Sequence, residues 1–412
     1  MKRFLWGVVF LGVLFWSTFL SPSMAAEKGP IKVGFLSPLT GQWAEVGKDM
    51  TNGFMMYMEE IGFKAGGRTI QVIREDTQAL PDTAVTKTRK LITHDKVAAV
   101  TGLVTAPSGL AVAPIANELE VPLIIACSAG DDNTQRKRVK WATRIGWTSS
   151  QPMHPFGEWV YKKLGYKKVA AIAVDFAFGY ENVGGFQRTF EEAGGQVIQK
   201  LWAPVNTNDF APYISNLSKE ADAVLAVMVG AMPMKFVKQY SESGLKLPVI
   251  CSGTTVDEYI LPAQGDEVIG YISPLHYSAA LDNPANKRFQ EKYTKKYNKI
   301  GSYYASHCYE MGMWLVRAIE AVKGDVEQKE AFLKAIKAVK LADIPRGPLS
   351  MDEYGNPIQN IYIRKVEKIK GVKWNTVIDT IPNVSQFWKW NPEEYLKAPP
   401  YSRDYPPCKY CK

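Results

Sequence analysis

The sequence predicts an α/β protein made of two lobes, each built around a parallel sheet. Short, continuously apolar strands alternate with amphipathic helices from about residue 30 onward. This alternation is typical of βαβ units whose sheet is covered on both faces. It starts again after about residue 150, and the chain of 412 residues is long enough for two domains of ordinary size.

The first half of the chain carries one set of alternating elements. Continuous apolar runs predict strands at residues 31–35, 70–73, 97–100 and 122–126. Residues 48–61 predict a helix because Met50, Phe54, Met58 and Ile61 recur near one face. The same reasoning predicts two further helices, at 83–93 and 108–118.

The second half repeats the pattern with more elements. Apolar runs predict strands at 169–174, 196–201, 223–229, 248–251, 268–272 and 361–366. Helical spacing predicts helices at 153–164, 183–193, 233–243, 285–297, 306–322 and 328–339. The last residues, 387–412, are rich in Pro and aromatic residues, and we expect them to form an irregular extension lying on one lobe.

Three polar, extended stretches are candidates for chain crossovers between the lobes: residues 144–150, 273–278 and 343–348. With three crossovers, lobe 1 comprises 27–147 plus 278–345, lobe 2 comprises 148–277 plus 346–386, and 387–412 is the extension. Open α/β sheets bind ligands beyond the carboxyl ends of their strands. We therefore expect the ligand site in the cleft between the lobes.

The N-terminus has the features of a cleaved secretory signal, which we assign to residues 1–26. Lys2 and Arg3 precede an uncharged, mostly apolar stretch at 4–20, and small residues at 23–26 offer a cleavage site. The alternative is an uncleaved membrane anchor, but 17 residues fall short of the ~20 that span a bilayer. The mature protein is therefore expected to be soluble and periplasmic.

Charge and cysteine content narrow the range of partners. The net charge is +9, and the basic residues are scattered rather than gathered with aromatic residues into a stripe, so nucleic acid is not an expected partner. There are five cysteines. In an oxidising compartment we expect Cys408 and Cys411 to form a disulfide, and Cys127, Cys251 and Cys308 to remain as buried thiols.

No group of residues predicts catalysis. The segment 41–49 has five residues between its glycines and Asp49 after the lysine, so it does not fit a phosphate-binding loop. The four histidines, at 94, 154, 276 and 307, show no metal-ligand spacing and no evident partner for a nucleophilic serine. We therefore expect no enzyme activity, cofactor or metal, although a secreted α/β hydrolase remains a rival class.

Small residues follow two neighbouring strands of lobe 1. Residues 102–108 come after one strand and open a helix, and residues 126–130 come after the next. Unpaired N–H groups at a helix N-terminus attract anions, and small side chains let a ligand approach the backbone. The two turns together predict a carboxylate clamp. The alternative is that small residues simply fit tight strand-to-helix turns.

The order and spacing of several segments resemble one known family over roughly residues 30–370. The segments are 31–41, 44–53, 76–77, 102–114, 121–124, 175–179, 283–289 and 304–310. Together, behind a signal peptide, they resemble the leucine/isoleucine/valine-binding proteins, the periplasmic solute receptors of ABC importers. The resemblance implies the type I periplasmic binding protein fold, with two Rossmann-like lobes on three hinge strands. It also implies a monomer that closes on its ligand and delivers it to a membrane permease.

The resemblance also points to ligand-binding positions. The family's carboxylate clamp falls near Thr105–Ala106 and Cys127–Ala129, and its lobe 2 aromatic residue falls on Phe178. Three positions depart from the family: Ala106 replaces a Ser, Ala129 replaces a Thr, and Gly253 replaces the Glu that holds the ligand ammonium. The candidate ligand-binding residues are Trp43, Thr105, Ala106, Ser108, Cys127, Ser128, Ala129, Phe178, Gly253, Thr254 and Tyr277.

The missing Glu bears on the ligand. A buried ammonium without a countercharge costs several kcal/mol, so we favour an organic acid without an α-ammonium, such as an aromatic carboxylate, over leucine-like amino acids. Branched-chain amino acids remain the alternative ligand. The alternative function is a ligand-sensing lobe that serves a sensor kinase or a chemoreceptor.

Overall fold

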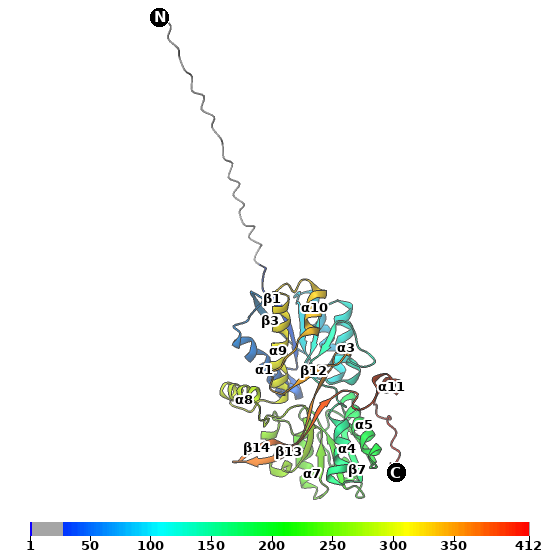
Figure 1. Cartoon of the computed structure of the whole chain (residues 1–412). Coiled ribbons are helices and arrows are strands. Elements are labelled where there is room, and N and C mark those ends of the chain that lie inside the picture. Colours follow the sequence, from blue (N-terminus) through cyan, green and yellow to red (C-terminus); the bar gives the residue numbers. More distant parts are fainter. Residues whose placement is uncertain (2–27, 412) are drawn as a thin grey trace.

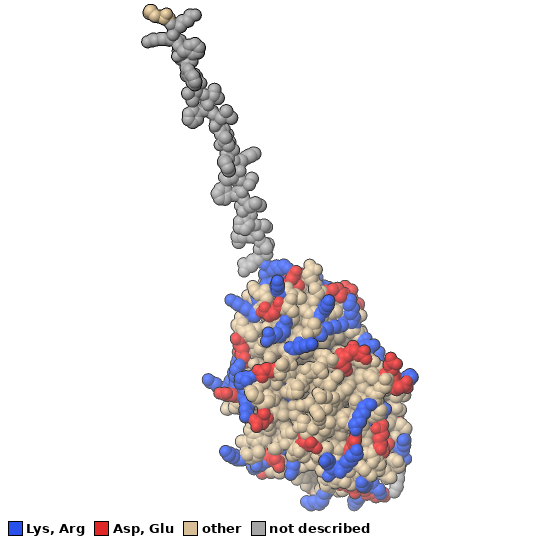
Figure 2. Space-filling view, in the orientation of Figure 1, with Lys and Arg blue, Asp and Glu red and all other residues tan. Residues whose placement is uncertain are grey.

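The structure is a computed structural model that describes Met1 and residues 28–411. The predicted signal sequence, apart from Met1, lies outside the described residues. The described chain forms two α/β lobes, drawn one above the other in Figure 1. Over the face drawn in Figure 2, basic and acidic side chains are interspersed, in keeping with the scattered charges of the sequence.

Lobe 1 is built on a six-stranded sheet with the order β2-β3-β1-β4-β5-β6. Its strands pair in parallel, except that β2 and β3 form a short antiparallel pair. The strands are β1 (Ile31–Ser37), β2 (Lys64–Ala65), β3 (Arg68–Asp76), β4 (Ala99–Gly102), β5 (Leu123–Ile125) and β6 (Ala142–Arg144). Nearly every side chain of β1 is buried, as expected for a sheet covered on both faces.

The helices of lobe 1 come from two separate parts of the chain. They are α1 (Ala44–Glu60), α2 (Pro81–Thr93), α3 (Ala106–Glu118), α8 (Pro284–Tyr297), α9 (Tyr303–Ala321) and α10 (Lys329–Ala338). Gly53 lets α1 and α9 touch, because an added Cβ would lie 2.0 Å from the Ala305 carbonyl oxygen. Buried Asp49 accepts hydrogen bonds from Ser302 (2.5 Å) and Tyr293 (3.0 Å), which ties α1 to the later helices.

Lobe 2 is built on an eight-stranded sheet with the order β12-β13-β11-β10-β9-β7-β8, to which β14 adds by pairing with β13. The four central strands and β8 pair in parallel, and β13 pairs antiparallel with its neighbours. The strands are β7 (Lys168–Val174), β8 (Gln196–Ala203), β9 (Ala223–Val227), β10 (Val249–Cys251), β11 (Ile272–Leu275), β12 (Leu349–Met351), β13 (Pro357–Ile369) and β14 (Val372–Val384).

The strand predicted at 268–272 is wrong by about four residues. A 3-10 turn covers Asp266–Val268, and β11 begins only at Ile272. Gly270 has a φ of 93° and the Tyr271 N–H donates to the Val268 carbonyl, so the chain turns here before it can join the sheet. Residues 268–272 are mostly apolar, which is why their pattern predicts a strand.

Lobe 2 helices are α4 (Met153–Trp159), which continues as a π-helical turn (Val160–Leu164), α5 (Ala177–Glu192), α6 (Ala211–Ser215) and α7 (Met232–Glu242). Helix α5 begins six residues before its predicted start. Its glycines lower helix propensity, but they permit close packing: an added Cβ at Gly185 would lie 3.0 Å from Ser150 Cβ, and one at Gly184 2.5 Å from the Tyr401 ring.

The hairpin of β13 and β14 is much longer than the single late strand predicted at 361–366. Lys370 and Gly371 join the two strands, both with positive φ (51° and 84°), the conformation that favours tight two-residue hairpin turns. Many side chains of β14 are polar or exposed, so apolar periodicity gave no sign of it.

The chain passes between the sheets three times: after β6, after β11 and before β12. Two predicted crossovers overlap strand ends, because Arg144 closes β6 and β11 covers Ile272–Leu275. Buried Arg346 joins the first and third crossovers: it donates to Glu310 Oε2 (2.5 Å) and to the Ile145 carbonyl (2.9 Å). The buried ion pair of Arg346 and Glu310 therefore lies where the first and third crossovers meet.

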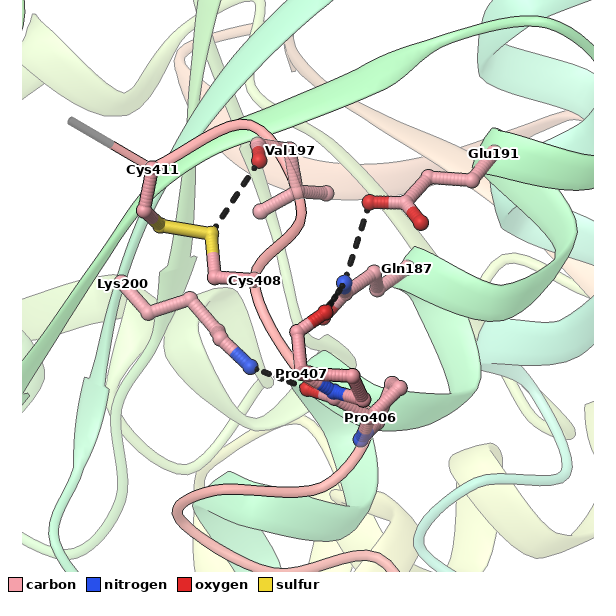
Figure 3. The surroundings of a disulfide bond; sticks show 8 residues. All are labelled: Gln187, Glu191, Val197, Lys200, Pro406, Pro407, Cys408 and Cys411. Atoms are coloured by element: carbon pink, nitrogen blue, oxygen red, sulfur yellow. Dashed lines mark hydrogen bonds between the residues drawn. A yellow bond between two sulfur atoms is a disulfide. The ribbon is translucent and has the colours of Figure 1, made fainter.

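The C-terminal extension is not wholly irregular. It contains the short helix α11 (Pro392–Lys397), whose cap Asn391 accepts a hydrogen bond from the Glu394 N–H. The structure joins Cys408 to Cys411 by a disulfide (Figure 3) and leaves Cys127, Cys251 and Cys308 as buried thiols. This is the cysteine arrangement expected from the sequence.

Candidate ligand-binding cleft

A narrow pocket lies between the lobes and encloses about 270 Å³ of empty space, part of it open to solvent. Segments from both lobes line it, through Trp43, Val104, Thr105, Ala106, Cys127, Ala129, Phe176, Phe178, Val229, Thr254, Tyr303 and Tyr304.

Two loops of lobe 1 form the polar side of the pocket. Thr105 is the N-cap of α3, and its hydroxyl lies 2.7 Å from that of Ser108. Ser128 Oγ donates to the Thr105 carbonyl at 2.9 Å and so joins the two loops. Among the residues that the structure describes, none accepts a hydrogen bond from the N–H of Ala106 or Ala129. These N–H groups, one at a helix N-terminus, are suited to an anionic ligand.

The loop that carries Ala129 is held in place from behind. Ser149 donates to the Ala129 carbonyl from both its N–H (2.8 Å) and its hydroxyl (2.9 Å). Fully buried Arg144 donates to the Gly130 carbonyl at 2.6 Å and to Asn356 Oδ1 at 2.8 Å. Burial lowers the pKa of Arg144 to about 10, so it remains charged at neutral pH. The Ala129 and Gly130 carbonyls are thus satisfied, while the Ala129 N–H has no partner among the described residues.

Aromatic rings form the rest of the pocket. Trp43 of lobe 1 lies against Gly230 of lobe 2, where an added Cβ would lie 3.4 Å from the indole. The rings of Tyr303 and Tyr304 lie 3.9 Å apart between centroids. Trp147 packs edge-on to Phe178 at 5.8 Å and supports it from behind. A flat, apolar ligand body suits these surfaces.

No charged side chain lines the pocket within the described part of the chain. A Cβ added at Gly253 would meet Leu275 (2.7 Å) and Arg364 Nη2 (2.9 Å), and that guanidinium donates to the Gly253 carbonyl. A carboxylate at position 253 would therefore face Arg364 rather than the pocket. Asp257 and Glu258 are buried nearby, and burial together with Glu258 holds the pKa of Asp257 well above its usual range.

The structure brings seven of the sequence-predicted residues together in the pocket: Trp43, Thr105, Ala106, Cys127, Ala129, Phe178 and Thr254. Ser108 and Ser128 support the clamp through hydrogen bonds, without lining the pocket. Gly253 does not line the pocket, and a side chain at this position would point toward Leu275 and Arg364. Tyr277 also lies elsewhere: its hydroxyl donates to Asn286 Oδ1 (2.9 Å) and accepts from Gln290 Nε2 (2.6 Å).

Five lining residues were not predicted: Val104, Phe176, Val229, Tyr303 and Tyr304. The two tyrosines open α9, which the sequence predicts to begin only at residue 306. Ser302 could have indicated the true start of α9, because serine is a preferred N-cap residue. Its hydroxyl accepts a hydrogen bond from the Ala305 N–H, so Tyr303 and Tyr304 lie in the first turn of the helix.

The thiol of Cys127 lies 4.0 Å from that of Cys308 on α9, and both are buried. Burial raises the pKa of the Cys308 thiol well above its ordinary value. A protonated, buried thiol is a poor nucleophile. At the pocket, buried Cys127 presents a small, largely apolar surface.

Comparison with known proteins places this geometry in context. The family described as periplasmic binding protein matches residues 30–371. The chain is 30% identical over 382 residues to the Leu/Ile/Val-binding protein homolog 6 of Brucella melitensis, covering 88% of this chain and 95% of that protein.

Two solved structures from Rhodopseudomonas palustris are also similar, both ABC transporter solute-binding proteins. One, from strain BisB5, is in complex with 3,4-dihydroxybenzoic acid; it has a TM-score of 0.83 and 31% identity, covering 87% of this chain and 98% of that one. The other is in complex with benzoate, with a TM-score of 0.82, 28% identity and the same coverage.

Proposed function

The chain belongs to the periplasmic binding protein family, and from that premise we propose that its ligand is a small aromatic carboxylate. Its function is that of a solute-binding protein of an ABC transporter, of the type that includes the branched-chain amino acid receptors. The proposal concerns which small carboxylate the cleft selects.

The observation that carries the proposal is the absence of any charged side chain lining the described cleft. An amino acid would bring a carboxylate and an ammonium into this space. The free N–H groups of Ala106 and Ala129 suit the carboxylate, but the ammonium would lack a partner. Burying an unpaired charge costs several kcal/mol, so the cleft selects against amino acids.

The apolar part of the cleft supports a ring. Trp43, Phe178 and Tyr303 present aromatic faces and edges within a narrow space. Aromatic pairs contribute about 0.5–1.5 kcal/mol beyond the burial of their area. The two similar R. palustris proteins were solved with benzoate and 3,4-dihydroxybenzoic acid, which are carboxylates of this kind.

The mechanism follows from the placement of the contacts on both lobes. Lobe 1 supplies the N–H groups of Ala106 and Ala129, and lobe 2 supplies Phe178 and Thr254. A ligand that touches both lobes stabilises the closed state relative to the open one. We propose hinge movement about the three crossovers, with lobe 1 as residues 27–147 plus 278–345 and lobe 2 as 148–277 plus 346–386. The closed form is the one that docks productively on the permease.

The same proposal covers the setting in which the protein works. We propose that a signal sequence is removed near Ala26 and that the mature protein is a periplasmic monomer without catalytic activity. Within residues 28–411, no helix is long and apolar enough to cross a membrane. Intact-mass measurement of protein released from the periplasm checks the cleavage, and recovery of Met1 in a membrane fraction contradicts it.

Two measurements test the ligand. Native mass spectrometry of the protein as purified identifies any retained ligand by mass. Calorimetric titration then compares benzoate and hydroxycinnamates with leucine, isoleucine, valine and phenylalanine. The proposal predicts binding of at least one aromatic carboxylate and weak or absent binding of the amino acids. Tight binding of a branched-chain amino acid with no response to the acids overturns it.

A further inference from the structure

The C-terminal tail, residues 387–411, lies across the junction of the two lobes beside the cleft. In Figure 1, helix α11 sits between the lobe 1 helix α3 and the lobe 2 helix α5, and the rest of the tail runs down lobe 2. The family match covers residues 30–371 and so ends before the tail. The matches to the two R. palustris structures cover 98% of each of those chains and 87% of this chain.

Several contacts anchor the far end of the tail to lobe 2. Gln187 of α5 donates to the Pro407 carbonyl (2.9 Å), and Lys200 of β8 donates to the Pro406 carbonyl (2.6 Å). Figure 3 shows these contacts around the disulfide, where the Cys408 sulfur lies 3.3 Å from the Val197 carbonyl oxygen. These bonds stay within one lobe, so hinge movement leaves them unchanged.

The middle of the tail packs on the same lobe. The Arg188 guanidinium of α5 stacks on the Trp390 ring at 3.6 Å. The Tyr401 hydroxyl lies 3.1 Å from His154 Nε2 of α4, and the Tyr401 ring occupies the space that Gly184 leaves free. The tail is therefore fixed to lobe 2 along most of its length.

One part of the tail reaches lobe 1. Arg136, in the lobe 1 loop between β5 and β6, donates to the Ala398 carbonyl at 2.6 Å and to the Tyr395 carbonyl at 3.4 Å. Its other amino group donates to Asp132 at 3.1 Å, which holds the guanidinium in position. A charged donor makes stronger hydrogen bonds than a neutral one. These bonds join lobe 1 to a segment that moves with lobe 2.

Beneath the tail the lobes also touch directly. The Asp131 N–H of lobe 1 donates to Glu181 Oε1 of lobe 2 at 3.0 Å. Tyr395, Pro400 and Tyr401 of the tail cover these two buried acids. The tail thus covers a direct contact between the two lobes.

We propose that the tail is a strap that favours the closed cleft through Arg136. Opening about the hinges carries lobe 1 away from a tail fixed on lobe 2, so the bonds from Arg136 to the tail must break. They stabilise the closed state and not the open one, which shifts the equilibrium toward closure and slows ligand release. The strap acts on closure itself and does not depend on which carboxylate is bound.

The test measures lobe separation in the full chain without ligand. Spin labels at Lys48→Cys on α1 and Lys238→Cys on α7, both exposed positions, report the distance between the two lobes. The native thiols are buried or disulfide-bonded. The variant Arg136→Met keeps an apolar stem over Tyr395 but removes the donors, and Lys137→Met removes a charge from the exposed neighbouring position as a matched control.

We expect Arg136→Met to increase the long-distance population about tenfold or more, the range for a lost hydrogen bond to a charged group, and Lys137→Met to leave it unchanged. Stopped-flow release of benzoate should accelerate by the same factor. Identical distance distributions for Arg136→Met and the parent, or equal shifts in both variants, overturn the strap. A failure of benzoate to bind contradicts only the proposed ligand, because the spin-label distances need no ligand.

Discussion

The two lobes contribute unlike surfaces to one cleft. Lobe 1 presents backbone N–H groups at Ala106 and Ala129, fixed by Ser128, Ser149 and Arg144 behind them. Lobe 2 presents Phe176, Phe178, Val229 and Thr254, and contributes no charge to the lining. Lobe 1 also contributes the rings of Trp43, Tyr303 and Tyr304. In the proposed function, the free N–H groups of lobe 1 therefore set the chemical class of the ligand, while rings from both lobes cover its body. Substitutions in the two lobes should therefore fail in different ways.

The largest effect should follow a negative charge placed in the clamp. Ala106→Asp puts a carboxylate at the proposed carboxylate clamp, and repulsion at short range should weaken benzoate binding by about 100-fold or more. An acidic residue at a helix N-terminus favours the helix, so folding should persist. Ala106→Ser is the matched control and should bind within about threefold of the parent. Calorimetric affinities of Ala106→Asp within tenfold of the parent contradict the clamp.

Removing a lobe 2 ring should weaken binding without changing its charge preference. Phe178→Ala removes the ring supported by Trp147 and should reduce benzoate affinity by about 10-fold to 30-fold, through lost ring contacts and burial. Phe178→Leu keeps apolar area and should lose about threefold. The measurement is calorimetric titration of both variants. An unchanged affinity for benzoate in Phe178→Ala excludes this ring from the ligand contacts.

A carboxylate introduced on the lobe 2 side of the cleft should make the protein favour ligands that carry an ammonium. Thr254→Asp places an acid in the lining, where it would pair with an ammonium, and Thr254→Asn is its neutral control of equal size. The affinity ratio of leucine to benzoate should rise about tenfold or more in the Asp variant relative to Asn. An equal ratio in both variants shows that Thr254 does not face the ligand's ammonium position.

Stability should depend on pH through the acids at the lobe boundary. Burial raises the pKa of Asp131 to about 6 and that of Glu181 well above its usual range. The folded state therefore holds a proton that the unfolded state has lost above about pH 4. The free energy of unfolding decreases with rising pH wherever the folded state binds more protons than the unfolded state. Stability therefore falls as the pH rises from about 4 toward the folded pKa.

Between pH 5 and pH 7 Asp131 alone should account for a loss of about 1.4 kcal/mol, which is one pH unit of linkage below its folded pKa, and Glu181 should add to that loss. Asp131→Asn mimics the protonated form and should flatten this part of the curve. Urea unfolding at several pH values measures both proteins. A variant with the same slope as the parent contradicts the assignment to Asp131.

The smallest effect should come from the tail disulfide. Because Cys408 and Cys411 enclose a very short loop, their bond constrains the unfolded chain little. Thiol titration of denatured, unreduced protein should give about three free thiols, with the bridge accounting for the other two cysteines. A count of five or of one refutes the pairing.

The sequence predicted most of the fold because its central strands are buried on both faces and so read as continuous apolar runs. It failed where that signal was absent. β14 is half polar, the start of α5 is rich in glycine, and the turn before β11 is apolar enough to resemble a strand. Each miss reflects tertiary packing overriding local propensity.

For the site, small-residue turns after β4 and β5 led to Ala106 and Ala129, because strand ends meet at one edge of a sheet. Tyr303 and Tyr304 could not be placed in this way. They come from a helix nearly 200 residues later in the chain, and only the return of that helix to lobe 1 brings them to the cleft. The contact between Arg136 and the tail could not be predicted from the sequence either, because its partners are about 260 residues apart in the chain.

The most direct test of the account isolates the ligand ammonium. Phenylglycine and phenylacetate share one skeleton and differ by the α-ammonium, as do leucine and 4-methylpentanoate. Calorimetric titration of the purified protein with both pairs measures what that group contributes. Because the described cleft lining holds no countercharge, the account predicts that the ammonium-free acid of each pair binds more tightly. Tighter binding of phenylglycine or leucine than of its ammonium-free partner would contradict it.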